Sequence, residues 1–146
     1  GPSPGTEIAG MIGLLILAEK NLGTGLIATV VHTLGSRPPQ LEATELDHSA
    51  LPEQIEALLR QGLEKVDRGD GALILADVYG ATHTNIACRL LTRGHIELIT
   101  GVNLPMLLRV LNYRQLKMDD LIDKALSGGC GGIICAANPA KIQESK

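Results

Sequence analysis

Met11-Ile-Gly-Leu-Leu-Ile-Leu-Ala-Glu-Lys-Asn-Leu-Gly-Thr-Gly-Leu26 is the stretch that decides the fold of this chain. Five apolar residues in a row precede Glu19, which predicts a strand buried on both faces of a sheet. The small residues after it predict a short loop and the start of a helix. In an open α/β sheet, ligands and catalytic groups lie at such a junction. Glu19 is therefore the first candidate for chemistry.

The rest of the sequence alternates apolar runs with amphipathic segments. This pattern predicts an α/β fold with an open, mainly parallel sheet and helices on both faces. We expect strands at residues 12–18, 40–46, 72–76, 96–100 and 133–137, and helices at 23–34, 49–66, 82–91, 105–112 and 118–127. Ser49 is the expected cap of the second helix, and Thr82 or Thr84 that of the third. Glycines in residues 128–132 predict a flexible corner before the last strand.

Composition excludes several classes of function. With a net charge of −3 and a pI of about 5.8, the chain lacks the clustered basic residues that nucleic-acid binding needs. Its apolar runs are shorter than a membrane span, and no signal peptide is apparent. Three cysteines give no disulfide framework, which favours a cytoplasmic location. We interpret residues 1–10 as a tag or linker remnant, Met11 as the native start, and residues 11–146 as one domain.

Two buried strands are predicted to end at acidic residues, Glu19 and Asp77. Either acid alone is equally consistent with a solvated loop, but in neighbouring strands both would project from the same edge of the sheet. Asp77 opens the segment Asp-Val-Tyr-Gly-Ala-Thr-His-Thr-Asn85. Gly80 and Ala81 let the backbone approach a ligand closely, and Thr82 offers a hydroxyl at a helix start. We therefore predict a phosphoryl-binding site there.

Three segments now carry a family resemblance: Met11 to Gly23, Asp77 to Asn85, and Gly101-Val-Asn-Leu-Pro-Met-Leu-Leu-Arg109. They resemble the mannose-family enzyme IIA component of the bacterial phosphoenolpyruvate:sugar phosphotransferase system, in its stand-alone form. The resemblance implies a phosphocarrier that accepts a phosphoryl group from HPr on a histidine at position 19 and passes it to a IIB component or a regulatory partner. It implies that Asp77 orients that imidazole and that Thr82 and Asn103 lie beside the phosphoryl group. It also implies a homodimer that exchanges a C-terminal antiparallel strand.

The chain departs from the family at the acceptor position, because Glu19 stands where the histidine is implied. An engineered phosphomimetic or phosphorylation-blocking substitution is the first interpretation, and a naturally degenerate homologue is the second. We expect Glu19 to face Asp77, where like charges disfavour ionisation of both. His83 stands where the family usually has proline, so the loop shape and the direction of this side chain stay open.

The other candidate groups have simpler interpretations. His32, His48 and His95 are expected to be structural or on the surface, and Cys88 to lie in the core. Cys130 and Cys135 lack a second ligand pair, so we expect no metal site, and no cofactor is implied. Two alternatives stay open for the function. One is a receiver-like signalling domain with Asp77 as phosphoacceptor and Glu19 near Mg²⁺, and the other is a regulatory module whose partners depend on the charge at position 19.

Overall fold

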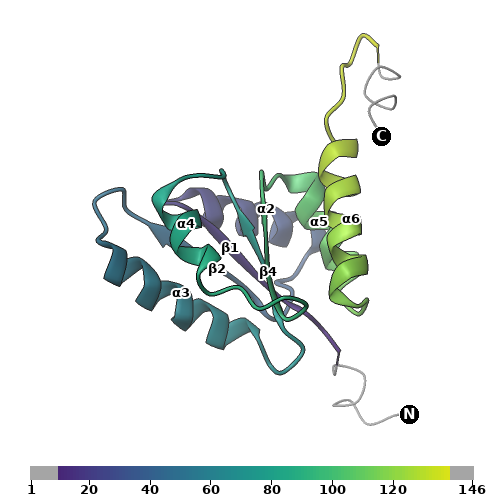
Figure 1. Ribbon diagram of the computed structural model, residues 1–146. Coiled ribbons are helices and arrows are strands. Elements are labelled where there is room, and N and C mark those ends of the chain that lie inside the picture. Colours follow the sequence, from purple (N-terminus) through teal and green to yellow (C-terminus); the bar gives the residue numbers. More distant parts are fainter. Residues whose placement is uncertain (1–9, 139–146) are drawn as a thin grey trace.

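The computed structural model describes residues 10–138, and all but Gly10 of the predicted linker lies outside this range. Strands alternate with helices along most of the chain (Figure 1). In chain order the elements are β1 (Gly13–Glu19), α2 (Leu22–Leu34), β2 (Leu41–Leu46), α3 (Pro52–Val66), β3 (Ala72–Ala76), α4 (Thr82–Cys88), β4 (Ile96–Thr100), α5 (Leu104–Asn112) and α6 (Met118–Gly131).

The described strands form one four-stranded sheet in the order β2-β1-β3-β4, and every pair is parallel. β1 is central, and its residues Gly13 to Ala18 are buried, as the uninterrupted apolar run predicts. The chain leaves β1 to form β2 on one side and returns to form β3 on the other. The carboxyl ends of β1 and β3 therefore lie at the point where the strand order reverses, which is where open α/β sheets place ligands.

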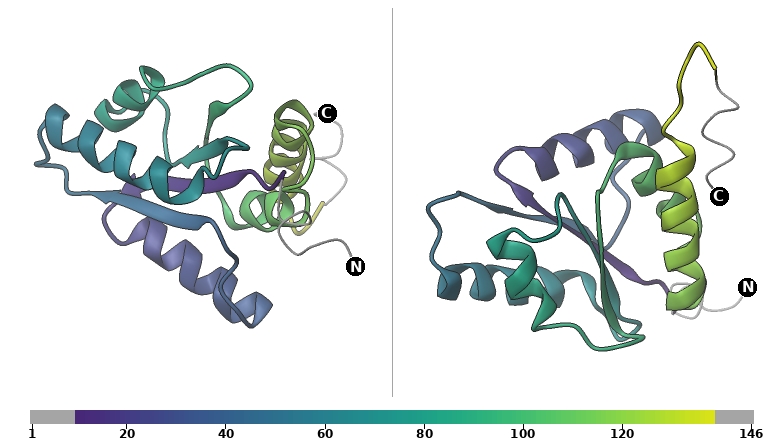
Figure 2. Two further views of the ribbon diagram at one scale, coloured as in Figure 1. Left: turned by 90° about the horizontal axis from the view of Figure 1, so that it is seen from below. Right: turned by 45° about the horizontal axis from the view of Figure 1, so that its top comes forward.

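Helices cover both faces of the sheet, as predicted. Figure 2 shows α3 and α4 on one face and α2, α5 and α6 on the other. The side chains of β1 alternate between the two cores, with Leu14 and Ile16 on the α2 side and Leu15 and Leu17 on the α3 side. Both cores are aliphatic, because the chain has no Trp or Phe.

The predicted helix caps are wrong. α3 begins after Leu51, whose N–H donates to Gln54 Oε1 at 2.8 Å, while the Ser49 hydroxyl donates instead to Asp47 Oδ1. α4 begins after Ala81, and the Thr84 hydroxyl donates to the Ala81 carbonyl at 2.9 Å rather than accepting from the backbone. In both cases a neighbouring backbone or carboxylate oxygen competes for the hydroxyl.

The C-terminal prediction is also wrong in two respects. The glycine segment is no flexible corner, because α6 continues through it to Gly131. A Cβ on Gly128 would stand 2.6 Å from Arg109 Cβ, and one on Gly132 would stand 2.4 Å from Pro105, so these glycines allow α6 to pack closely on α5. Residues 133–137 form no strand here; they are exposed, and Ile133 is 56% accessible.

Some predicted burial is wrong as well. Cys88, expected to lie in the core, is exposed at the end of α4. Within residues 10–138, no helix has the length and apolar character required to cross a membrane.

Candidate functional site

The carboxyl ends of β1 and β3 bring the two predicted acids together. The Glu19 backbone N–H donates to Asp77 Oδ2 at 3.1 Å. Glu19 ends β1 and is exposed, and no hydrogen bond or ion pair within residues 10–138 engages its carboxylate. The backbone of Glu19 thus fixes Asp77, while the Glu19 side chain remains available to a binding partner.

Asp77 has a second, buried partner that the sequence did not reveal. His83 Nε2 lies 2.7 Å from Asp77 Oδ1, and their side chains are only 7% and 11% exposed. The Val78 N–H donates to the same Oδ1 at 2.7 Å. The only sequence signal was spacing, since His83 follows Asp77 by six residues and lies in the first turn of α4. The structure therefore places His83, rather than the side chain at position 19, against Asp77.

The pKa of Asp77 is lowered from its ordinary value. Burial acts to raise it, but hydrogen bonds from His83, Val78 and the Glu19 N–H, together with the charge of His83, outweigh burial. We had expected repulsion between Glu19 and Asp77 to disfavour their ionisation. That expectation fails for Asp77, because its contact with Glu19 is made to a backbone donor.

The predicted phosphoryl-binding loop is open to solvent. Gly80 is exposed with a φ of +90°, a left-handed conformation that favours glycine, and no atom stands where its Cβ would be. Ala81 is extended and half-buried, and Thr82 is exposed with no hydrogen bond from its hydroxyl among the described residues. The loop thus offers an unhindered backbone and a free hydroxyl beside Asp77.

Asn103 lies in the neighbouring loop after β4 but has a structural role in this chain. Its Oδ1 caps α5 by accepting from the Met106 N–H at 2.9 Å, and its Nδ2 donates to the Gly129 carbonyl at 3.3 Å. The Gly101 N–H donates to the Asp77 carbonyl at 3.0 Å, which fastens this loop to the one after β3. Asn103 thereby links the site to the α5–α6 pair.

Exposed apolar side chains follow each of the two acids in the chain. Tyr79 is 78% exposed and Val78 is 55% exposed in the loop after β3, and Leu22 is 46% exposed at the start of α2. We call these three residues the apolar rim. Exposed apolar groups beside polar ones are typical of protein-docking surfaces.

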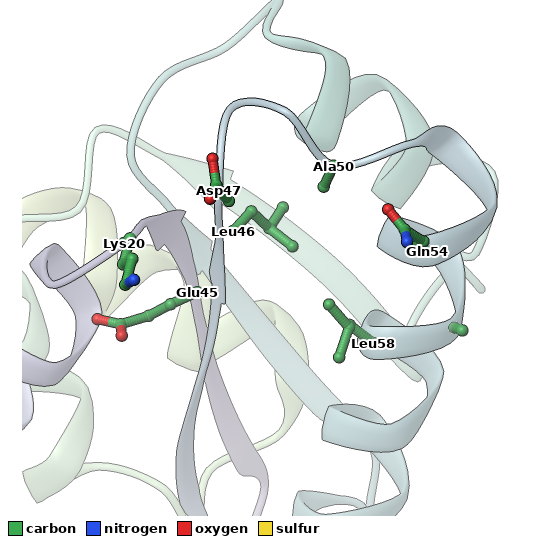
Figure 3. A pocket seen from close by; sticks show the side chains of 8 residues that line it. Lys20, Glu45, Leu46, Asp47, Ala50, Gln54 and Leu58 are labelled. Carbon is green, nitrogen blue, oxygen red and sulfur yellow. The ribbon is translucent and has the colours of Figure 1, made fainter.

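A groove of about 610 Å³ opens at the carboxyl end of β2. In Figure 3, Lys20 and Glu45 lie on one side of it, and Ala50, Gln54 and Leu58 lie on the other. Glu45 also accepts from the Thr24 N–H at 2.6 Å; burial acts to raise the pKa of Glu45, but hydrogen bonds from Thr24, Asn21 and Gly23 lower it overall. Because Lys20 follows Glu19 in the chain, the groove adjoins the candidate site.

The other three histidines make no hydrogen bond to Glu19 or Asp77 within residues 10–138. His32 and His48 are exposed, which confirms that they are surface residues. His95 Nε2 lies 2.9 Å from Asp67 Oδ2 at the amino end of the sheet, which confirms a structural position. Between residues 10 and 138, no three His, Cys, Asp or Glu residues are grouped so as to hold a metal ion.

Comparison with known proteins identifies related sequences. The family model described as "PTS system fructose IIA component" matches residues 13–126. A stretch of 74 residues, 49% of this chain, is 36% identical to the mannose-specific EIIAB component of the phosphotransferase system of Escherichia coli (strain K12). That stretch covers 23% of the Escherichia coli protein, so the chain spans about a quarter of that relative.

Solved structures share the fold. The phosphotransferase system component EIIA from Streptococcus agalactiae has a TM-score of 0.77 at 22% identity, over 87% of this chain and 98% of that one. The mannose/sorbose specific IIA subunit from Enterococcus faecalis has a TM-score of 0.75 at 17% identity, over 86% and 94% of the two chains. At these identities the likeness supports the fold alone.

Proposed function

Because the chain belongs to the mannose-family enzyme IIA components of the bacterial phosphoenolpyruvate:sugar phosphotransferase system, we propose that HPr docks on the carboxyl end of its sheet. In this proposal position 19 is the phosphoacceptor position. The protein acts in the cytoplasm as a homodimer, with a IIB component or a regulatory protein as its second partner.

Glu19 prevents transfer of a phosphoryl group through a histidine at position 19. A carboxylate lacks the imidazole nitrogen on which a phosphohistidine forms, so we propose that this chain does not carry a phosphoryl group at position 19. It instead presents a permanent negative charge, smaller than that of a phosphoryl group, to its partners. The protein would then act as a regulator held in a form that imitates the phosphorylated state.

The exposed Glu19 carboxylate carries this proposal. The backbone of Glu19 is fixed against Asp77, while no described residue neutralises its side chain. The apolar rim gives a partner a surface to bury beside that charge. Gly80 and Thr82 supply open backbone and a free hydroxyl on the same side.

A phosphotransfer assay tests the acceptor position. The chain, its E19H variant and its E19Q variant would each be incubated with phosphoenolpyruvate, enzyme I and HPr, and acid-labile phosphate would be measured. We expect label on E19H alone, mapped to position 19. Equal labelling of all three proteins, or none on E19H, would contradict the assignment of position 19.

A binding assay tests the regulatory part. Titration of ¹⁵N-labelled HPr with each protein should shift the same HPr resonances, because the apolar rim is unchanged. For a regulatory partner that recognises the charge, E19Q should bind about tenfold more weakly than the Glu19 protein, which corresponds to about 1.4 kcal/mol. The result would oppose a charge-dependent role if E19Q and the Glu19 protein bound every partner equally.

A further inference from the structure

Asp77 is the residue that the proposed function would use to orient an imidazole at position 19, yet its carboxylate is already engaged. Oδ1 accepts two hydrogen bonds, from His83 Nε2 and the Val78 N–H, both at 2.7 Å. Oδ2 accepts the Glu19 N–H at 3.1 Å. A carboxylate oxygen has two lone pairs, so Oδ1 is saturated and Oδ2 has one acceptor position left.

The hydrogen bond between Asp77 and His83 is largely buried. The His83 side chain is 7% exposed, and it lies on α4 between buried residues such as Ile86 and the end of β3. A hydrogen bond to a carboxylate in such a place is stronger than one at the surface. An imidazole introduced at position 19, where Glu19 is exposed, would be left with the one remaining acceptor position on Oδ2, on a carboxylate whose charge already stabilises His83.

We infer that His83 has replaced the side chain at position 19 as the imidazole partner of Asp77, so that restoring a histidine at position 19 does not by itself restore efficient phosphotransfer. This inference rests on the proposed docking of HPr. It assigns His83 as a positioning residue that acts through Asp77, with no contact to the phosphoryl group.

The chemistry of transfer explains why the pairing matters. The acceptor imidazole attacks phosphorus with one ring nitrogen, forming a new N–P bond as the N–P bond of the donor phosphohistidine breaks. The donor phosphohistidine carries a proton on its second ring nitrogen, so the donor leaves as a neutral imidazole. The proton on the second nitrogen of the acceptor stays there. Positive charge develops on the acceptor ring, and a carboxylate hydrogen-bonded to that second nitrogen stabilises it. Asp77 offers less of this stabilisation while it also binds His83.

A set of double variants tests the inference. Initial rates of acid-labile phosphorylation by phosphoenolpyruvate, enzyme I and HPr would be compared for E19H, E19H/H83A and E19H/H83Q. We expect E19H/H83A to be labelled at least tenfold faster than E19H, because Asp77 is released. E19H/H83Q should stay within about twofold of E19H, since the Gln amide keeps a donor near the place of Nε2.

His95 supplies the matched control. It makes the same kind of contact, Nε2 to an aspartate at 2.9 Å, but at the opposite end of the sheet. E19H/H95A should therefore phosphorylate at the rate of E19H, although it loses a similar ion pair. Circular dichroism would confirm that each variant is folded, and E19H/H83N would replace E19H/H83A if that variant does not fold.

Several results would overturn the inference. It fails if E19H and E19H/H83A are labelled at equal rates, if neither is labelled, or if E19H/H83Q is as fast as E19H/H83A. It also fails if phosphate maps to His83 in the Glu19 protein, because His83 would then be an acceptor. HPr titrations separate the two proposals. If HPr binds and E19H and E19H/H83A are phosphorylated at equal rates, only the role of His83 is contradicted. If HPr does not bind, both the proposed function and this inference are contradicted.

Discussion

The two ends of the parallel sheet use polar side chains for opposite purposes. At the amino end, Arg114 is 2% exposed and donates to the backbone carbonyls of Ile12, Pro39 and Gln40. Gln40 is also buried, and its Nε2 donates to the Val66 carbonyl at 2.8 Å. These buried side chains donate to backbone carbonyls at the amino end of the sheet, so this end is closed.

At the carboxyl end, polar groups stay available. Glu19 and Thr82 are exposed, and the apolar rim stands in solvent beside them. Each end nevertheless contains an Asp–His contact within hydrogen-bond distance: Asp77–His83 at the carboxyl end and Asp67–His95 at the amino end. The comparison indicates that the amino end stabilises the fold, while the carboxyl end holds groups positioned for a partner.

Replacement of Arg114 should give the largest effect. Burial lowers the pKa of Arg114 to about 10, so it is still charged at neutral pH, and its donors serve three carbonyls. R114M removes the Arg114 donor from the Ile12 and Pro39 carbonyls and leaves the Gln40 carbonyl with only the Leu14 N–H. It should therefore lower the free energy of unfolding by about 4 kcal/mol. Urea denaturation would measure the change. A loss below about 1 kcal/mol would refute the stabilising role of this end.

Two glycines with the same conformation give a matched comparison between the ends. Gly71 at the amino end has a φ of +89° and Gly80 at the carboxyl end has +90°. An added Cβ would stand 2.3 Å from the His95 carbonyl oxygen at Gly71, but would meet open space at Gly80. G80A should cost about 1 kcal/mol for the left-handed backbone alone, and G71A about 3 kcal/mol because backbone must also move. Equal losses in thermal unfolding would contradict the difference in packing.

The sequence predicted most of the architecture, because the strands are apolar runs bounded by turns. The predicted strands at 72–76 and 96–100 agree with β3 and β4 at every residue. The glycine segment was mispredicted, since helix propensity disfavours glycine while packing of Gly128 on Arg109 requires it. The Asp77–His83 contact could not be predicted from the sequence, because it depends on the angle at which α4 folds back over the end of β3.

The pH dependence of stability should show the smallest effect. The pKa of Asp67 is lowered: burial acts to raise it, and hydrogen bonds from Gly69, Gly71 and His95 outweigh burial. The pKa of Asp77 is lowered in the same way. A carboxyl group whose pKa is lower in the folded state stabilises the fold at pH values above its unfolded-state pKa of about 3.9. That stability is lost as the pH falls through the pKa of the folded state. Each acid should therefore contribute stability at pH 7 that disappears at more acidic pH.

Replacing either acid with asparagine removes its share of this dependence. D67N and D77N should each lose less stability than the unmodified protein between about pH 5 and pH 2, because an amide does not titrate there. Denaturation at a series of pH values would measure both slopes. The two variants should differ in phosphotransfer. In the E19H background, D77N slows phosphorylation, whereas D67N leaves the rate unchanged because Asp67 lies at the amino end. If D67N slowed phosphorylation as strongly as D77N, the separation between a stabilising end and a partner-binding end would fail, since both acids would then affect position 19 equally.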